Sequence, residues 1–149
     1  MRGVVQRCSR AAVRVGGEQI AAIGSGLVVL VGVSVRDTEA DAAWLADKVR
    51  GSRIFPDGRA NMNRSVTEAG GAALVVSQFT LYGDARRGRR PSFVEAARPE
   101  QAEPLVASVV AALRDAGLEV AEGRFGAMME VDLVNDGPVT ILLDSEKRF

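Results

Sequence analysis

One continuous apolar run, residues 27–33 (LVVLVGV), constrains the fold of this chain more than any other segment. It has the length of a strand, and a strand without polar positions is typical of one that is covered on both faces. The spacing of apolar residues predicts two helices, over residues 38–53 and 99–117. Thr38 and Asp41 are spaced as in a capping box, and Pro99 suits the first turn of a helix.

The rest of the chain reads as strands and turns. Further strands are predicted over residues 5–15, 19–21, 72–81, 118–121, 129–134 and 139–143, and Gly16-Gly17 supplies a tight turn after the first of them. At 149 residues and 47% hydrophobic composition, the chain matches the usual size of one domain with one core. We therefore expect one domain over residues 1–149, with a compact, β-rich α/β fold and two main helices.

The composition excludes several kinds of chemistry. The chain has no histidine, which rules out Ser-His-Asp, Cys-His and His-based zinc sites. Its one cysteine, Cys8, permits no internal disulfide and fits a reducing compartment.

The charges of the chain are balanced. Lys and Arg (19) equal Asp and Glu (19) in number, so any contact with nucleic acid must use a local patch. No apolar stretch approaches the roughly 20 residues of a membrane span. We expect a soluble, cytoplasmic protein without a metal or cofactor.

Arg7 is out of place in its predicted strand. The odd positions of residues 5–15 form one apolar face, and Arg7 and Ser9 fall on that same inward face. An unpaired guanidinium is costly to bury, so Arg7 needs a carbonyl cluster, a carboxylate or a ligand as its partner. The alternative is that this end of the strand is exposed and that Arg7 reaches solvent.

Gly137-Pro138 lies between two segments that both read as strands. Proline cannot donate to a sheet ladder and is not expected in the middle of a strand. Taken locally, the stretch NDGP (residues 135–138) favours a hairpin turn between the two strands.

Polar residues gather at the end of the strand predicted over residues 72–81. Ser77, Gln78 and Thr80 offer two hydroxyls and an amide, and backbone N–H groups at the strand end could face a developing oxyanion. This pattern suits acyl transfer. The alternative is that the three are ordinary strand residues on an exposed face.

Two long motifs resemble the signatures of the D-aminoacyl-tRNA deacylases. The first is SQFTLYGD (residues 77–84) with Gly88 and RPSF (residues 90–93), and the second is FGAMM (residues 125–129) with NDGPVT (residues 135–140). Arg7 and the segments 53–55 and 61–63 also match, so the resemblance covers essentially the whole chain. Cys8 departs from the aliphatic residue of that family at its position.

The resemblance implies a homodimer that hydrolyses the ester between a D-amino acid and its tRNA, with the active site at the subunit interface. Ser77, Gln78, Phe79 and Thr80 would hold the amino acid and the terminal adenosine. The resemblance also assigns a role in substrate binding to residues of the second motif: Phe125, Ala127, Met128, Met129, Asn135, Gly137 and Pro138. The methionine pair would line the adenosine pocket, although two methionines beside a strand also suit a plain core.

Chirality would be read by exclusion. The resemblance implies a cis Gly137-Pro138 peptide that reaches across from the partner subunit with its carbonyl oxygens toward the substrate. Arg7 could hold those carbonyls by charge-assisted hydrogen bonds. These carbonyl oxygens would leave room for a hydrogen atom on one side of the substrate Cα and would clash with a larger group. Glycine has hydrogen on both sides, so glycyl-tRNA mischarged on the tRNA for alanine should also be cleaved.

Several alternatives stay open. Thr80 could be a nucleophile, but the chain has no histidine to serve as its base. The free 2′-hydroxyl of the terminal ribose, or a water that it orients, could instead assist the attack. The arginines of one loop, Arg86, Arg87, Arg89 and Arg90, could contact acceptor-stem phosphates or form a solvated loop. The chain could also be a non-catalytic RNA- or nucleotide-binding module, or a deacylase of relaxed chirality.

Overall fold

A computed structural model describes all of residues 1–149. Its main sheet has six strands: β2-β1-β3-β6-β7 are neighbours in that order, and β8 pairs with β1. The elements in chain order are β1 (Arg2–Val15), β2 (Glu18–Ile23), β3 (Gly26–Gly32), α1 (Glu39–Gly51), β4 (Phe55–Pro56), β5 (Met62–Arg64), β6 (Ala72–Ser77), the 3-10 helix η1 (Phe79–Tyr82), α2 (Pro99–Asp115), β7 (Val120–Glu122) and β8 (Glu130–Asp144).

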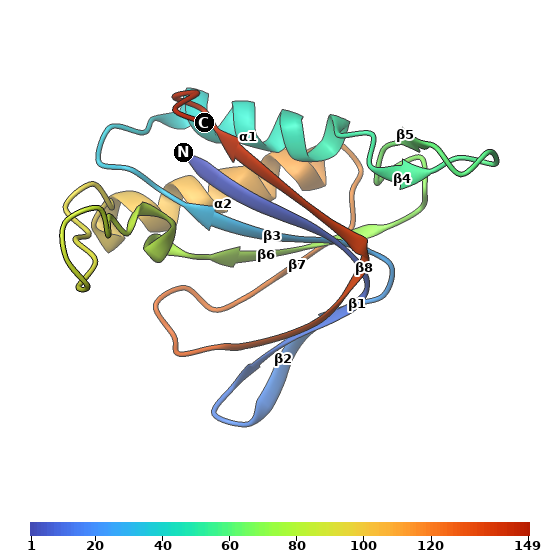
Figure 1. The fold of residues 1–149 in the computed structure, drawn as a ribbon. Helices are drawn as coiled ribbons and strands as arrows, with labels where there is room; N and C mark the ends of the chain where they lie inside the picture. Colours follow the sequence, from blue (N-terminus) through green and yellow to red (C-terminus); the bar gives the residue numbers. More distant parts are fainter.

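The sheet is mixed and strongly curved. Strands β3, β6 and β7 run parallel, whereas β1 pairs antiparallel with β2, β3 and β8. Figure 1 shows both helices on one side of the sheet, while β2 and the first half of β8 curl round the other side. The expected β-rich α/β fold with two main helices is confirmed. Neither helix is long and apolar enough to cross a membrane.

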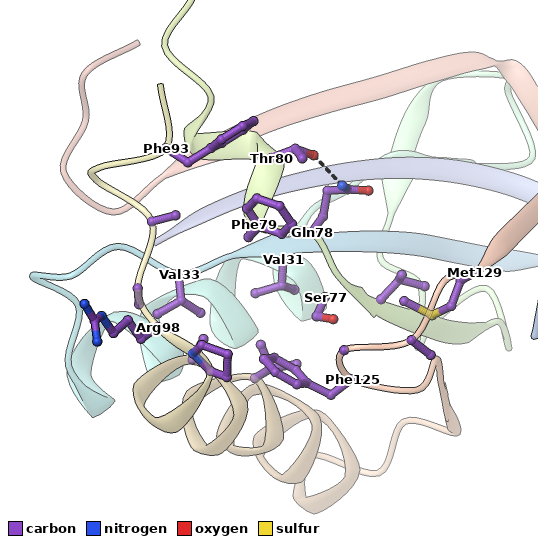
Figure 2. Close-up of a pocket in the computed structure, with 18 of the residues that line it drawn as sticks. Val31, Val33, Ser77, Gln78, Phe79, Thr80, Phe93, Arg98, Phe125 and Met129 are labelled. Carbon is purple, nitrogen blue, oxygen red and sulfur yellow. Dashed lines mark hydrogen bonds between the residues drawn. The ribbon is translucent and has the colours of Figure 1, made fainter. Parts of the chain in front are cut away.

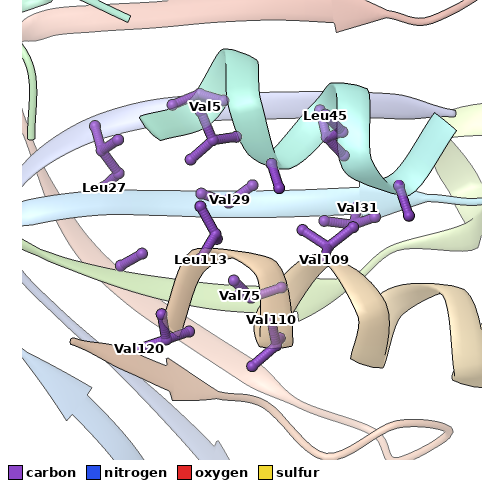
Figure 3. Packing of buried hydrophobic residues seen from close by; sticks show 14 of the residues in the cluster. Val5, Leu27, Val29, Val31, Leu45, Val75, Val109, Val110, Leu113 and Val120 are labelled. Atoms are coloured by element: carbon purple, nitrogen blue, oxygen red, sulfur yellow. The ribbon is translucent and has the colours of Figure 1, made fainter. Parts of the chain in front are cut away.

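Strand β3 is covered on both faces, as its apolar run predicts. On one face Val29 packs with Leu45 of α1 and Leu113 of α2 (Figure 3). On the other face Val28 packs with Leu74 in a second buried cluster, to which β2 and β8 contribute. The second face of β3 is therefore covered by the curled edge of the same sheet. Two helices are enough because they need to cover only the first face.

The helix boundaries agree with the sequence patterns. Thr38 is the N-cap of α1, and its backbone N–H donates to Asp41 Oδ2 over 2.9 Å in a capping box. Pro99 opens α2. Both helices end slightly before the predicted limits, at Gly51 and Asp115.

Two predictions about strands are wrong. Ser9 is exposed rather than inward-facing, because the pairing of β1 with β8 shifts register on either side of Cys8 and turns Cys8 inward instead. Strand β6 ends at Ser77, not at residue 81, because the chain turns into η1 after the N–H of Gln78 donates to the carbonyl of Val31 over 2.7 Å.

The hairpin expected at Gly137-Pro138 is also wrong. The segments on either side of it belong to one strand, β8, and both pair antiparallel with β1 in the same direction. The register passes from Cys8 opposite Asn135 to Gln6 opposite Thr140. Residues 136–139 thus face only Arg7 and leave the ladder as a local bulge, which removes the conflict between proline and strand pairing.

Candidate active site

A cavity of about 730 Å³ lies at the carboxyl end of β6 (Figure 2). Strands β3 and β6 run parallel, with Val31 opposite Ser77, so both strands end at this edge of the sheet. Helix α2 and the segment before it form one wall, and the loop before β8 forms another. The cavity brings together eight of the residues predicted for the site: Ser77, Gln78, Phe79, Thr80, Phe125, Ala127, Met128 and Met129.

The turn η1 presents the polar groups of the cavity. Gln78 donates its side-chain amide N–H to Thr80 Oγ1. The first backbone hydrogen bond of the turn runs from the N–H of Leu81 to the carbonyl of Gln78. The N–H groups of Phe79 and Thr80 precede that bond and have no partner inside the short helix. Two backbone donors without a helical partner and a hydroxyl therefore belong to residues that line the cavity.

Close packing holds η1 in place from behind. A Cβ atom built on Gly32 would lie 2.9 Å from Leu81 Cβ and 3.0 Å from the carbonyl oxygen of Gln78, so only glycine fits there. Arg2 donates from Nη1 to the carbonyl of Leu81 over 2.8 Å and lies 4.5 Å from the ring centroid of the buried Tyr82. The turn that carries Thr80 is thus fixed from the strands β3 and β1.

Exposed apolar side chains form the rim of the cavity. The exposed fraction is 57% for Phe79 and 91% for Met128. Phe79 packs edge to face with Phe93, with 5.1 Å between the ring centroids. Aromatic faces open to solvent suit stacking of a flat ring such as a nucleobase.

The cavity walls contain only one ionisable side chain. That side chain is Arg98, and no carboxylate, lysine, tyrosine or cysteine lines the cavity. Nowhere in the structure do three His, Cys, Asp or Glu side chains gather in a way that could hold a metal ion. No side chain lining the cavity can accept a proton from Thr80 near neutral pH.

Several lining residues were not predicted from the sequence. They are Val31, Val33, Val76, Phe93, Ala96, Ala97, Arg98, Pro99, Ala102, Val106, Gly126 and Val131. Phe93 belongs to the first motif, and Pro99 was identified only as the start of a helix. Nothing in the local sequence places Arg98 at a cavity, because its position depends on how α2 packs against β3.

The structure does not bring Arg7, Asn135, Gly137 or Pro138 into this cavity. They lie together at the bulge of β8, where Gly137 and Pro138 are exposed and their peptide bond is cis, as the family resemblance implies. Asn135 braces the bulge, since its Oδ1 accepts the N–H of Val139 over 2.9 Å and its Nδ2 donates to Thr140 over 3.1 Å.

Arg7 has the partners that its burial requires. It is 9% exposed, and it donates from Nη1 to the carbonyl of Ile54 over 2.6 Å and from Nε to the carbonyl of Asp136 over 3.1 Å. Its Nε also lies 3.3 Å from the carboxylate of Asp136. The carbonyls that Arg7 holds are therefore not those of Gly137 and Pro138, as expected, but that of the residue before them and one from the segment before β4.

The four loop arginines are not equivalent. Arg86 donates through Nε and Nη2 to both carboxylate oxygens of Asp84, over 2.9 and 2.7 Å. These side-chain bonds and the backbone N–H of Arg86 hold the pKa of Asp84 well below its usual range. Arg87, Arg89 and Arg90 are exposed and make no ion pair. Arg86 is thus an internal brace of the loop, and the other three are free to meet an anion.

A β-rich α/β fold thus carries one large, mainly apolar cavity, whose polar groups come from Ser77, Gln78 and Thr80. Such a pocket suits a ligand that combines an apolar or aromatic part with a polar group. A family model described as D-Tyr-tRNA(Tyr) deacylase matches residues 4–144. The chain belongs to this family, and the family expected from the two motifs is confirmed.

Relatives named D-aminoacyl-tRNA deacylase match the chain along its full length. The relative from Symbiobacterium thermophilum is 65% identical over 100% of this chain and 99% of its own. The relative from Desulfitobacterium hafniense is 58% identical over 100% of both chains. The relative from Thermus aquaticus is 55% identical over 99% of this chain and 97% of its own.

Similar folds are found among solved structures, including the following two. A structure described as a c-Myc DNA unwinding element binding protein has a TM-score of 0.91 and 43% identity, covering 97% of this chain and 99% of that one. A probable eukaryotic D-amino acid tRNA deacylase has a TM-score of 0.80 and 18% identity, covering 95% of this chain and 97% of that one. The second likeness concerns the fold alone.

Proposed function

We propose that this protein hydrolyses the ester bond of D-aminoacyl-tRNA and releases the free D-amino acid and tRNA. The observation that carries the proposal is the cavity at η1, where unpartnered N–H groups and Thr80 stand opposite an apolar, aromatic wall. The acyl carbonyl would lie against the N–H groups, and the adenine would lie on the apolar rim. Membership of the deacylase family supports this assignment. Because the substrate serves translation, we expect the protein to act in the cytoplasm.

The ester bond is proposed to break without a nucleophilic side chain. Thr80 needs a base to become a nucleophile, but its hydroxyl accepts a hydrogen bond from Gln78, and an amide is not a base. A water molecule that the free 2′-hydroxyl of the terminal ribose orients then attacks the acyl carbon. The bond from that carbon to the ribose 3′-oxygen breaks, and the 3′-oxygen takes up the proton that the water loses. The N–H groups of Phe79 and Thr80 stabilise the oxyanion as it forms. An aminoacyl ester is already activated, so positioning supplies much of the rate.

Chirality is proposed to be read across a homodimer. Gly137 and Pro138 are exposed and lie outside the cavity of their own protomer, and this supports a role in the cavity of the partner subunit. In the partner's cavity, the backbone of Gly137 and Pro138 would leave room for a hydrogen atom on one side of the substrate Cα and would clash with any larger group. The D-amino acid side chain would point outward, and glycyl-tRNA would pass the same filter. Arg7 and Asn135 hold the bulge in shape from below.

The body of the tRNA is proposed to meet the arginine loop. Arg87, Arg89 and Arg90 are exposed and free of carboxylate partners, which suits contact with acceptor-stem phosphates. Replacing Arg87 and Arg89 with glutamine should reduce the slope of log affinity for tRNA against log salt concentration by about one for each phosphate that is no longer bound. An unchanged slope would rule out binding of phosphate by this loop.

Incubation with D-tyrosyl-tRNA tests the proposed activity. A deacylase releases free tyrosine with turnover, whereas a nucleic-acid-binding module protects the ester. The description of the 43% identical structure as a DNA unwinding element binding protein makes the second outcome worth measuring. A relaxed deacylase would also cleave L-tyrosyl-tRNA at a comparable rate.

Variants of Thr80 test the mechanism. If the 2′-hydroxyl assists the attack, Thr80→Ala should keep a substantial part of kcat, and Thr80→Ser should lie close to the wild type. D-tyrosyl-tRNA that ends in 2′-deoxyadenosine should be cleaved at least a hundredfold more slowly, a loss on the scale of general-base assistance. Complete loss of activity in Thr80→Ala alone, with the deoxy substrate still cleaved, would instead point to a threonine nucleophile.

A further inference from the structure

Arg98 is the only charged residue of the cavity walls. It is exposed, and its guanidinium makes no ion pair and no hydrogen bond with the protein. In Figure 2 its side chain lies at one end of the cavity, with the guanidinium turned away from Ser77 and Phe125. A single free cation thus stands at the mouth of an otherwise uncharged pocket.

The backbone of Arg98 is fixed on both sides. The preceding residue, Ala97, is buried, and its N–H donates to the carbonyl of Val33 over 2.8 Å. The carbonyl of Arg98 accepts the N–H groups of Gln101 and Ala102 over 3.0 and 2.9 Å, in the first turn of α2. The guanidinium therefore projects from a rigid junction between β3 and α2 and not from the middle of a loop.

No carboxylate neutralises this cation. Glu95, the acidic residue nearest to it in the preceding segment, is already engaged, since it accepts hydrogen bonds from Arg36 over 3.3 Å and from Arg148 over 3.2 and 3.1 Å. Glu100, in the first turn of α2, makes no ion pair with Arg98. The charge of Arg98 remains available for an anion from outside the protein.

The proposed substrate carries one anion at the corresponding place. When its ester lies at η1 and its adenine lies on the apolar rim, the only anionic group next to the terminal nucleoside is the phosphodiester on its 5′ side. We infer that Arg98 binds this phosphate. The inference rests on the proposed function and extends it from the aminoacyl-adenosine to the first internucleotide phosphate. A guanidinium fork suits a phosphate because two parallel N–H groups can bind two of its oxygens.

Two minimal substrates separate this contact from the others. One is the 3′-O-D-tyrosyl ester of adenosine, and the other is the same ester of adenosine 5′-monophosphate, which adds only the phosphate. The wild type should show a KM roughly tenfold lower for the monophosphate ester, on the scale of one charge-assisted contact. Arg98→Gln should remove this preference, so that the ratio of the two KM values falls from roughly ten to about one. Arg98→Lys should keep part of it.

Arg59→Gln is the matched control. Arg59 is exposed in the turn between β4 and β5, outside the cavity, and its replacement changes the net charge by the same amount. This variant should keep the wild-type ratio of the two KM values, and thermal unfolding should confirm that both variants are folded.

The possible outcomes are distinct. If Arg98→Gln raises KM equally for both esters, or if the wild type shows no preference for the monophosphate while still cleaving D-tyrosyl-tRNA, the phosphate contact is refuted and the proposed function stands. If the wild type leaves D-tyrosyl-tRNA intact, the proposed function fails and this inference fails with it.

Discussion

Replacing Arg7 with methionine should destabilise the protein and loosen its discrimination between D- and L-substrates. Methionine keeps much of the apolar stem but removes every donor. The carbonyl of Ile54 then loses its partner in a buried place, and the carbonyl of Asp136 loses the bond that ties the bulge of β8 to β1.

The size of the effect follows from these hydrogen bonds. A hydrogen bond to a charged group contributes about 1.5–3 kcal/mol, and the full amount applies at the buried Ile54 carbonyl. The second bond counts for less because Asp136 is exposed to water, and its half-exposed carboxylate adds at most about 1 kcal/mol. We expect Arg7→Met to lose about 3 kcal/mol of the free energy of unfolding. Arg7→Lys should lose about half as much, because one ammonium group cannot reproduce the two directed N–H donors.

Urea denaturation at a fixed protein concentration measures this loss, with the midpoint shifting and the slope unchanged. Arg10→Met is the control on the same strand, since Arg10 forms only an exposed ion pair with Asp132 and should lose less than about 1 kcal/mol. In parallel, the ratio of D- to L-tyrosyl-tRNA cleavage should fall in Arg7→Met and not in Arg10→Met. Equal stability of the two variants, or an unchanged ratio, would refute the role assigned to Arg7.

Four further results are expected. Gly32→Ala should lower kcat at least tenfold, because the new methyl group would push against Leu81 in the turn that carries Thr80; an unchanged kcat would contradict the fixed turn. Burial raises the pKa of the Cys8 thiol, so a thiol reagent should label Cys8 only at the rate of unfolding. Between about pH 6 and 9, kcat should follow the substrate's amino group, because no residue lining the cavity titrates there; a protein-derived inflection would reveal a missed base. An equal mixture of Gly32→Ala, which impairs the cavity, and an inactive Pro138 variant should regain about a quarter of the wild-type sites if each bulge serves the cavity of its partner, and none if it serves its own protomer.

The core of the fold can be predicted well from the sequence, because the spacing of apolar residues follows directly from which side chains are buried. The apolar run of residues 27–33 becomes the doubly covered strand β3, and Thr38 with Asp41 caps α1 as their spacing predicts. The end of β6 could not be predicted in the same way. Residues 79–82 include Phe, Thr and Tyr, which favour strands, and only packing against Gly32 and Val31 turns them into η1.

The continuity of strand β8 could not be predicted either, because it too depends on packing between segments that are distant in the sequence. Gly137-Pro138 has the local chemistry of a turn, but pairing of both flanks with the long strand β1 overrides it and leaves a bulge instead. The family resemblance located eight of the twenty residues that line the cavity, and all eight lie in the two motifs. Arg98 lies in neither motif, and only the packing of α2 against the end of β3 places it at the cavity.

The most direct test of the central claim is the rate of deacylation of D-tyrosyl-tRNA and L-tyrosyl-tRNA made from the same tRNA. Both should be measured in single turnover with enzyme in excess. The two substrates differ only at one carbon atom, so tRNA contacts and ester reactivity cancel in the ratio. We predict rapid release of D-tyrosine, with the L-ester decaying no faster than it does in buffer. Comparable cleavage of both esters, or protection of both, would contradict the account.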